Sequence, residues 1–402
     1  MGLLAETQPL REVTLRNLLS FGPDTEPLQL ESLNVLIGPN GSGKSNFIEA
    51  LGLLAAAPKH LATPVREGGG VYNWIWKGKG GQSTGPLGPT ASLEVVAKPS
   101  KLDRPLRHVI KFQESNQRFG LTAERIERAD PQSAQTNAAS VVHQFDSMRD
   151  FVEQFSNRTQ SVPKEPLAPD ESILSQRKGA DQYPEITALG WLYGRFRLYR
   201  EWSFGPHTAL RQPQKADQQN DFLKPDAANL GLVLNRLRRE TAAKQRILEY
   251  LREIYDGIED YDVSVEGGTV QVFLQESGST IPATRLSDGT LRYLCLLAIL
   301  CDPTPPPLVC IEEPELGLHP DIVPTLARLL KEASTRTQLI VTTHSDILVD
   351  ALTETPQSVV VCEKVDGQTS MRRLDKQKLS KWLDKYRLGE LWIDGELGGK
   401  RW

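Results

Sequence analysis

The chain has 402 residues, of which 39% are hydrophobic and 24% charged, and its formal net charge is −4. This composition is typical of a globular protein and argues against a fibrous repeat or wholesale disorder, while the length predicts two to three domains or one large α/β domain with insertions. The slightly acidic balance excludes a globally basic nucleic-acid coat but leaves a local basic patch open.

The cysteines and the start of the chain favour a cytoplasmic protein. Cys295, Cys301, Cys310 and Cys362 form no CxxC pair, so we expect reduced core thiols rather than disulfides or a zinc site. The first ten residues lack the basic and apolar regions of a signal peptide. The longest apolar stretch, around residues 293–301, is too short to cross a bilayer, so no membrane contact is expected.

The N-terminal segment predicts strands followed by a helix. Val13 and Leu15 alternate with polar residues, as in a half-buried strand. Residues 29–38 end in a tight apolar run that predicts a buried strand, and residues 46–57 predict a helix. The glycine-rich stretch 68–89 predicts a long loop or a loosely held hairpin. Three later segments then predict an antiparallel sheet: 92–98, 108–113 and 118–128.

The middle of the chain has a different character. Residues 130–182 are rich in Ser, Gln, Pro and Asn and predict mobile loops with short helices near 141–155. Residues 191–202 are aromatic and basic. Arg195, Arg197 and Arg200 there either contact nucleic-acid phosphates or are the solvated face of an amphipathic strand, which we favour.

Further along, residues 227–255 have a helical pattern, in which 234–240 are interpreted as a solvated face. Residues 261–275 predict a β-hairpin around Gly267-Gly268. The last third alternates strands and helices, with strands at 308–313, 337–345 and 357–364. This βαβ alternation indicates a parallel sheet.

Residues 38–45, GPNGSGKS, fit the pattern G-x-x-x-x-G-K-[ST] of a phosphate-binding P-loop. The motif follows a predicted strand and opens a predicted helix, so backbone N–H groups and the helix dipole converge on one point. Lys44 is placed to reach the β- and γ-phosphates, and the Ser45 hydroxyl to ligate Mg²⁺. The candidate ATP-binding residues are Asn40, Gly41, Ser42, Gly43, Lys44, Ser45 and Asn46.

Two further motifs end predicted buried strands. Glu312 and Glu313 are adjacent and therefore point in opposite directions, so Glu312 is the candidate Mg²⁺ residue and Glu313 the candidate general base. His344, in TTHS, is the candidate contact for a γ-phosphate or a catalytic water. In isolation each of these motifs also fits a structural strand end, but their order after the P-loop favours a catalytic role.

A fourth motif, LSDGT at residues 286–290, precedes a predicted helix. Ser287 is suited to cap that helix, and the helix N-terminus would attract an anion. Taken alone, the motif favours a simple helix cap.

Together the motifs resemble the ABC-type ATPase heads of the SMC/RecF group. They are also similar to the prokaryotic AAA-type ATPases related to the overcoming-lysogenization-defect (OLD) nucleases. The resemblance makes Glu312-Glu313 the Walker B motif, residues 315–319 the D-loop and His344 the switch histidine. It also makes Ser287, Asp288 and Gly289 a signature that completes a partner's ATP site in trans. Gln82 and Gln113 are poor candidates for the Q-loop, and Arg16 and Asn17 lie where related heads contact nucleotide.

The resemblance implies an α/β fold of the P-loop NTPase class: an ABC-type head with a mixed or parallel sheet core, an antiparallel β subdomain and a helical insertion. We expect an N-terminal lobe over 1–128, a mainly helical and partly flexible insertion over 129–260, and a C-terminal lobe over 261–365. A Trp-rich tail, 366–402, carries Trp382, Trp392 and Trp402, and either packs on the head, which we favour, or docks a partner.

The function implied by the resemblance is ATP hydrolysis with Mg²⁺ in a head-to-tail homodimer that gates a DNA-related process, in repair or anti-phage defence. DNA and a separate nuclease effector, of Toprim or another type, are the further partners implied, because no nuclease motif is found and the segment after His344 is too short for a Toprim domain. Other classes stay open: a nucleotide-gated scaffold with slow hydrolysis, or a P-loop kinase, which needs neither LSDGT nor His344. The long insertion argues against a transporter subunit.

Overall fold

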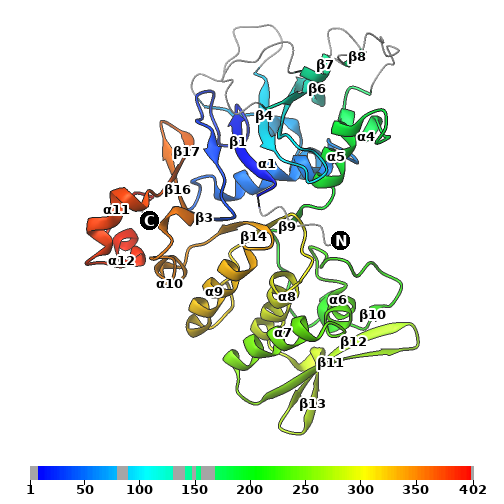
Figure 1. Ribbon diagram of the computed structural model, residues 1–402, viewed down its shortest axis with the longest axis vertical. Coiled ribbons are helices and arrows are strands. Elements are labelled where there is room, and N and C mark those ends of the chain that lie inside the picture. Colours follow the sequence, from blue (N-terminus) through cyan, green and yellow to red (C-terminus); the bar gives the residue numbers. More distant parts are fainter. Residues whose placement is uncertain (1–7, 79–88, 130–140, 147–150, 155–167, 400–402) are drawn as a thin grey trace.

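The computed structural model describes residues 8–78, 89–129, 141–146, 151–154 and 168–399. They form a layered α/β molecule in which an antiparallel sheet lies above a central sheet and helices cover the underside of the central sheet (Figure 1). This is the mixed α/β architecture expected from the sequence.

The central sheet has the strand order β17-β16-β3-β15-β14-β9 within the described residues. The five strands from β16 to β9 run parallel to their neighbours, and β17 is antiparallel to β16. The bounds are β3 (Leu33–Ile37), β9 (Arg197–Tyr199), β14 (Leu308–Glu312), β15 (Gln338–Thr342), β16 (Val359–Val365) and β17 (Gln368–Arg373). Because both faces of this sheet are covered, its parallel strands are nearly continuous apolar runs.

The antiparallel sheet has the order β2-β1-β4-β5-β6-β7-β8 among the described residues. Its strands are β1 (Leu10–Arg16), β2 (Leu28–Gln29), β4 (Ala91–Ala97), β5 (Leu106–Ser115), β6 (Arg118–Arg128), β7 (Val141–Asp146) and β8 (Phe151–Gln154). The short helices expected near 141–155 are therefore wrong, because β7 pairs with β6 and extends the sheet. The boundary expected at residue 128 consequently falls inside one sheet.

A smaller sheet projects from the helical side and is formed by β10 (Gln214–Lys215), β11 (Ile258–Glu266), β12 (Thr269–Glu276) and β13 (Ser279–Pro282). The hairpin expected at Gly267-Gly268 is confirmed, since both glycines have positive φ and join β11 to β12. The expected helical insertion thus contains strands as well as helices, and β9 within it joins the central sheet.

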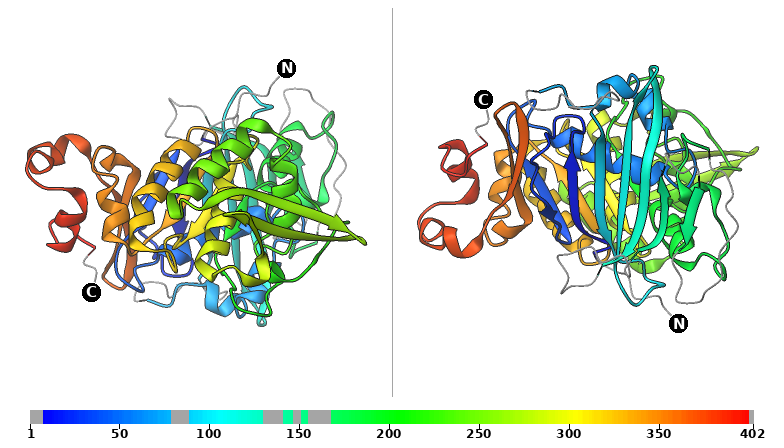
Figure 2. Two further views of the ribbon diagram at one scale, coloured as in Figure 1. Left: turned by 90° about the horizontal axis from the view of Figure 1, so that it is seen from below. Right: turned by 90° about the horizontal axis from the view of Figure 1, so that it is seen from above.

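The helices divide between the two faces of the central sheet (Figures 1 and 2). Helix α1 (Lys44–Ala56) lies between the sheets, where α5 (Pro184–Tyr193) joins the same core. Four longer helices belong to the core on the opposite face: α6 (Leu230–Leu237), α7 (Thr241–Ile254), α8 (Asp288–Leu300) and α9 (Val323–Ala333). The shorter helices are α2 (Thr63–Glu67), α3 (Val71–Trp74), α4 (Ile173–Gln176), α10 (Asp346–Asp350), α11 (Lys376–Leu383) and α12 (Leu388–Ile393), with 3₁₀ turns η2 (Ala209–Arg211), η3 (Ala283–Arg285), η4 (Pro320–Ile322) and η5 (Pro356–Ser358).

Alternate residues of the central strands belong to two separate hydrophobic cores. Leu36 of β3 packs in the core that contains α1, whereas Val35 and Ile37 pack in the core that contains α8 and α9. This follows from the period of two in a strand. The four cysteines are free and buried in these cores, as expected.

The described part of the glycine-rich stretch after residue 68 is better ordered than expected. Trp74 ends α3 and is fully buried, and its carbonyl accepts a hydrogen bond from the Leu19 N–H at 2.7 Å. The prediction of a loop or loose hairpin is wrong there, because the aromatic side chains supply a core. Residues 79–88, with Gln82, lie outside the described residues.

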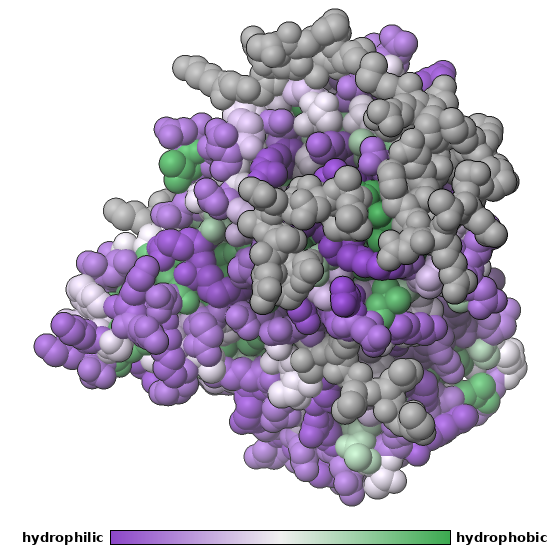
Figure 3. All heavy atoms as spheres, turned by 45° about the horizontal axis from the view of Figure 1, so that its top comes forward, coloured by the Kyte–Doolittle hydropathy of each residue, from purple (hydrophilic) through white to green (hydrophobic). Residues whose placement is uncertain are grey.

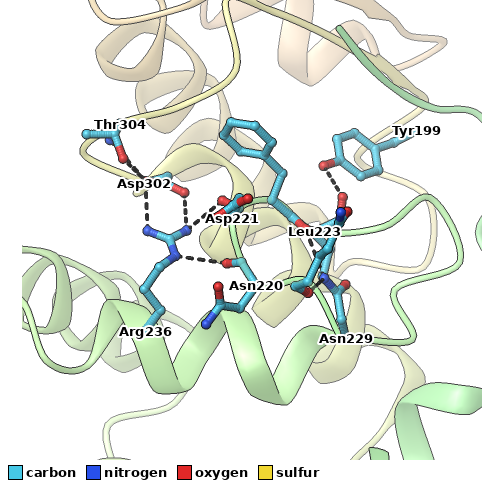
Figure 4. Close-up of polar contacts among 10 residues, drawn as sticks. Tyr199, Asn220, Asp221, Leu223, Asn229, Arg236, Asp302 and Thr304 are labelled. Atoms are coloured by element: carbon cyan, nitrogen blue, oxygen red, sulfur yellow. Dashed lines mark hydrogen bonds and ion pairs between the residues drawn. The ribbon is translucent and has the colours of Figure 1, made fainter. Parts of the chain in front are cut away.

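The expected solvated face at 234–240 also needs correction at Arg236. Its guanidinium pairs with the buried Asp302 at 2.5 Å and donates to the Asn220 and Asp221 carbonyls (Figure 4). Asp302 in turn accepts from the Thr304 N–H at 3.0 Å. In the same region the Tyr199 hydroxyl of β9 donates to the Leu223 carbonyl at 2.8 Å, so these contacts fasten the helical layer to the edge of the central sheet.

The tryptophans of the C-terminal tail have different environments. Trp392 of α12 is fully buried and donates to the Gly399 carbonyl, which fits the expected packing on the head, whereas Trp382 of α11 is exposed beside Tyr386. Trp402 lies outside the described residues. The surface above the antiparallel sheet shows hydrophobic side chains as separate small patches among hydrophilic ones (Figure 3). Among the described helices, none combines the length and apolarity needed to span a bilayer.

Candidate functional site

The candidate site lies where three neighbouring parallel strands end. β3 leads into the P-loop, β14 ends at Glu312, and β15 ends two residues before His344. The register places Glu312 opposite Thr342, and Thr342 opposite Leu36. Because parallel strands share one carboxyl edge, three motifs far apart in the sequence meet there.

The P-loop backbone depends on its glycines. Gly38, Gly41 and Gly43 all have positive φ, which side-chain-bearing residues rarely adopt. A Cβ atom added at Gly38 would lie 2.1 Å from the Cys362 carbonyl oxygen, so the loop also packs tightly against β16. Asn40 and Gly41 are exposed, whereas Asn46 is half-buried on the first turn of α1.

Lys44 is buried beneath this loop. Its ammonium donates to the carbonyls of Gly38 at 2.7 Å and Pro39 at 3.0 Å. Burial lowers the pKa of Lys44, while Cys362, Glu313 and Glu312 act in the opposite direction. A buried ammonium bound only by neutral carbonyls is poised to gain from an incoming anion.

Ser45 and Glu312 meet directly. The Ser45 hydroxyl donates to Oε2 of Glu312 at 2.9 Å, and Nε of Arg200 donates to the other carboxylate oxygen at 2.9 Å. A second nitrogen of Arg200 lies 3.3 Å from Glu49, which is one helical turn after Ser45. Arg200 therefore pairs with both Glu312 and Glu49.

Glu313 lies beside His344, with Nε2 of the imidazole 3.7 Å from Oε1 of the carboxylate. Both side chains are partly exposed, so solvent and ligands can reach them. Glu313 also has a left-handed backbone, with a φ of 44°. A non-glycine residue in this conformation is strained and persists only where its surroundings hold it.

The loop after β15 is supported by Glu315. Its Oε1 accepts hydrogen bonds from the Thr343 hydroxyl at 2.6 Å and the His344 N–H at 3.1 Å. Its Oε2 is buried without a hydrogen-bond partner among the described residues. Burial raises the pKa of Glu315, against the effect of these hydrogen bonds.

The LSDGT segment caps α8, as expected from the sequence. Ser287 accepts a hydrogen bond from the Thr290 N–H at 3.0 Å. Arg211 holds the segment from outside, because its guanidinium donates to the Leu286 carbonyl at 2.6 Å and to Asp288 at 2.5 Å. A Cβ atom added at Gly289 would lie 2.7 Å from the Gly317 carbonyl, so this segment packs against the expected D-loop.

The structure thus brings Lys44, Ser45, Glu312, Glu313 and His344 together, while the contacts of Ser287, Asp288 and Gly289 are with Thr290, Arg211 and Gly317. Other candidates lie apart. Gln113 is opposite Gly120 in the antiparallel sheet, and the Asn17 amide donates to the Thr90 carbonyl. Arg16 is exposed at the end of β1.

Sequence reasoning missed three arginines at the site. Arg200 was a candidate for nucleic acid or solvent, yet it binds Glu312. Arg211 and Arg292 were not singled out, and Arg292 donates to the Glu313 carbonyl at 2.6 Å. A basic residue directly after a strand of the central sheet was the available signal for Arg200. The other two depend on tertiary contacts that sequence spacing does not reveal.

The residues present fit ATP and Mg²⁺. The buried Lys44 ammonium and the Ser42 hydroxyl, which is buried without a hydrogen-bond partner in the described part of the chain, lie at the loop backbone and form a donor set suited to phosphate oxygens. The paired Ser45 hydroxyl and Glu312 carboxylate are the oxygen ligands that Mg²⁺ prefers.

Solved structures of SMC heads share this fold. The SMC head bound to the C-terminal winged-helix domain of ScpA matches with a TM-score of 0.56 at 14% identity, over 92% of this chain and 99% of that one. The Pyrococcus furiosus SMC head with an extended coiled coil, bound to the C-terminal domain of ScpA, matches with 0.54 at 14%, over 94% and 98%. The Pyrococcus yayanosii SMC head with a coiled coil and joint gives 0.52 at 13%, over 94% and 99%.

By sequence, no curated protein matches the chain. The family described as "AAA domain, putative AbiEii toxin, Type IV TA system" matches residues 33–132 and 212–350. These two segments contain the P-loop, the LSDGT segment, the paired acids and His344, and together they cover more than half of the chain. The chain therefore belongs to this family of AAA domains and has the fold of an SMC-type ATPase head.

Proposed function

We propose that the protein binds ATP at the P-loop and hydrolyses it to ADP and phosphate. The observation that carries this proposal is the meeting of Ser45, Glu312, Glu313 and His344 at one edge of the central sheet. They come from three different motifs, and together they supply phosphate binding, a metal site, a base and a contact for the γ-phosphate.

Lys44 and the loop backbone bind the phosphates in this proposal. The lysine exchanges its carbonyl partners for phosphate oxygens, which favours its charged form. Ser45 and Glu312 would hold Mg²⁺, which neutralises phosphate charge when bound. The Glu312 carboxylate would then bind both Arg200 and the metal.

Glu313 is the proposed general base. It takes a proton from a water whose oxygen attacks the γ-phosphorus, while the bond to the bridging oxygen of ADP breaks. His344, 3.7 Å from Glu313, is placed to orient the carboxylate and to contact the γ-phosphate. The oxygen of the attacking water becomes part of the inorganic phosphate that is released, and ADP is the leaving group.

We further propose that two copies close head to tail around ATP. Ser287, Asp288 and Gly289 of each copy would complete the site of the other, which suits an exposed helix N-terminus. Solved SMC heads of the same fold are bound to ScpA domains. By analogy, we propose that closure is transmitted to a partner protein or to DNA, in repair or anti-phage defence. The effector would be a separate chain, such as a nuclease of Toprim or another type. Four free, buried cysteines support a reducing, cytoplasmic setting.

The test uses Glu313→Gln, which keeps the shape of the side chain and removes the base. We expect this variant to bind ATP as the wild type does, to hydrolyse it at least about 100-fold more slowly, and to double in mass on ATP-Mg²⁺ in light scattering. The exposed Glu259→Gln is the matched control and should behave as the wild type.

Each contrary result has a distinct meaning. Wild-type hydrolysis by Glu313→Gln would remove Glu313 from the role of base. A monomer in ATP-Mg²⁺ would contradict closure in trans. A constitutive oligomer indifferent to ATP would favour a scaffold, and ADP formation only with an added acceptor would favour a kinase.

A further inference from the structure

Arg292 is a buried cation in the middle of the molecule. It lies on the second turn of α8, five residues after the cap Ser287, and only 7% of it is exposed. Burial lowers the pKa of its guanidinium, while the charges of Glu315 and Glu313 act in the opposite direction. Burying an arginine is costly, so its contacts indicate why it is there.

Those contacts reach the backbone of Glu313. A terminal nitrogen of Arg292 donates to the Glu313 carbonyl at 2.6 Å. On its other side the guanidinium lies over the rings of Trp202, at 5.3 Å, and Phe204, at 5.7 Å. These rings are stacked with 8° between their planes, so they form a firm support for the cation.

The Glu313 backbone needs such a support. With a φ of 44° it is strained, and its N–H is held by the Thr342 carbonyl at 3.0 Å. Its carbonyl accepts from Arg292 and also from the Leu316 N–H at 3.1 Å. Of the two groups that donate to the Glu313 carbonyl, the Leu316 N–H belongs to the same loop, whereas the Arg292 guanidinium is a side chain from α8.

Helix α8 also contacts the far end of the same segment. Gly289, on its first turn, packs so closely on the Gly317 carbonyl that a Cβ atom there would lie at 2.7 Å. The segment from Glu313 to Gly317 is therefore held by α8 at both ends. A movement of the LSDGT segment at the start of α8 has to move Glu313 as well.

We propose that Arg292 is the positioning residue of Glu313, holding its strained backbone and coupling it to the LSDGT segment through α8. This inference rests on the proposed ATPase function and adds a residue to it. It makes Arg292 a link within one chain between the surface offered to a second copy and the carboxylate that activates water.

The test compares Arg292→Met, which removes the donor and keeps the length, with Arg292→Lys, which keeps a buried cation. Steady-state kinetics give kcat and KM, and binding of a fluorescent ATP analogue gives nucleotide affinity. We expect Arg292→Met to lower kcat by about 10- to 100-fold with affinity unchanged, because small misplacements of a catalytic group have effects of this size. Arg292→Lys should recover part of the loss.

Two further variants separate positioning from general loss of stability. Arg236→Met removes another partly buried arginine, whose partner is Asp302, so it should lower stability without changing kcat. Trp202→Leu leaves Arg292 and its hydrogen bond in place but removes one supporting ring, and should lower kcat about three- to ten-fold even if Arg292→Met does not fold.

The outcomes separate the inference from the function it rests on. Wild-type kcat in both Arg292→Lys and Trp202→Leu, or in a folded Arg292→Met, overturns the positioning role while the ATPase stands. Hydrolysis that is absent in the wild type, or unchanged in Glu313→Gln, overturns the proposed function instead. In the double variant with Glu313→Gln, Arg292→Met should lower the rate no further, since positioning acts through Glu313; an additive loss would contradict it.

Discussion

At the scale of single residues, Arg200 sets the charge around Glu312. Its guanidinium binds Glu312, which also accepts from Ser45, and Glu49, which lies one helical turn after Ser45. A cation in this place competes with Mg²⁺ for the same carboxylate. Mg²⁺ affinity should therefore depend on Arg200.

We expect Arg200→Gln to lower the Mg²⁺ concentration that half-saturates ATP hydrolysis by about two- to five-fold, the range for a partly exposed ion pair. The measurement is a Mg²⁺ titration at saturating ATP. Arg195→Gln is the matched control, because Arg195 stacks on Trp191 and Phe222. An unchanged or weaker Mg²⁺ requirement in Arg200→Gln would show that the arginine does not compete for Glu312.

Glu315 gives a prediction about pH. Burial raises its pKa above the ordinary 4.5, so the folded state holds this proton more tightly than the unfolded state. Its contribution to stability is therefore greatest at low pH and is lost as pH rises through the raised pKa.

The change to make is Glu315→Gln, which keeps the acceptor for Thr343 and His344 but does not ionise. Between about pH 5 and pH 8 the wild type should lose unfolding free energy relative to this variant. Urea unfolding at both pH values measures it, with Glu259→Gln as the exposed control. Parallel pH profiles of Glu315→Gln and wild type would refute the raised pKa.

At the scale of elements, the N-terminus of α8 has two roles, helix capping and the proposed contact with a second copy. Substitutions at Ser287 can separate the two. Ser287 caps the helix through the Thr290 N–H, and in the proposed dimer it also meets the partner's ATP. Aspartate caps a helix as well as serine does, but its negative charge repels a phosphate.

Ser287→Ala should cost about 1 kcal/mol of stability through loss of the cap. Ser287→Asp should keep wild-type stability yet lower ATP hydrolysis by about 10-fold or more, because about 1.4 kcal/mol of repulsion is enough for that factor. Denaturant unfolding and steady-state rates measure the two effects. Full activity in Ser287→Asp would reduce the LSDGT segment to a helix cap.

The elements that the sequence predicted best are those with a strong local pattern. β3, β14 and β15 are mostly apolar and largely buried, and the P-loop and α1 follow from GPNGSGKS. The short helices expected near 141–155 were wrong for the described residues, because pairing with β6 makes Val141–Asp146 a strand and Phe151–Gln154 pairs with it in turn. Tertiary contacts overrode local composition there.

In the candidate site, too, the residues of local motifs were predicted and those defined by tertiary contacts were not. Lys44, Ser45 and the two acids follow from motifs whose residues are contiguous. Arg200, Arg211 and Arg292 act across elements distant in the chain, and nothing in their local sequence identifies the carboxylate or carbonyl that each one binds. Motifs therefore predicted the ligand-binding groups, but not the side chains that hold them.

At the scale of the whole molecule, the C-terminal tail supports the P-loop. Trp392 donates to the Gly399 carbonyl, the Gly399 N–H donates to Glu363, and a Cβ atom at Gly399 would lie 3.5 Å from Cα of Gly38. The Thr369 hydroxyl of β17 also donates to the Ser42 carbonyl at 3.0 Å.

Trp392→Ala should therefore destabilise the protein by about 3–5 kcal/mol, the usual cost of emptying a large buried site. Trp382→Ala, at an exposed tryptophan of the same tail, should change stability by less than about 0.5 kcal/mol. Chemical denaturation of both variants measures the difference. Equal effects would mean that α12 does not pack on the head as a structural part of it.

The central sheet can form around β3 only after the two strands that pair with it, β15 and β16, have been synthesised. These two strands, which pair with β3 on either side, are made about 300 residues after β3. Until then an emerging chain carries an apolar strand with two open edges, a species prone to aggregation and dependent on chaperones. The P-loop conformation, which rests on Cys362 and Thr369, consequently forms only after these two residues have been made.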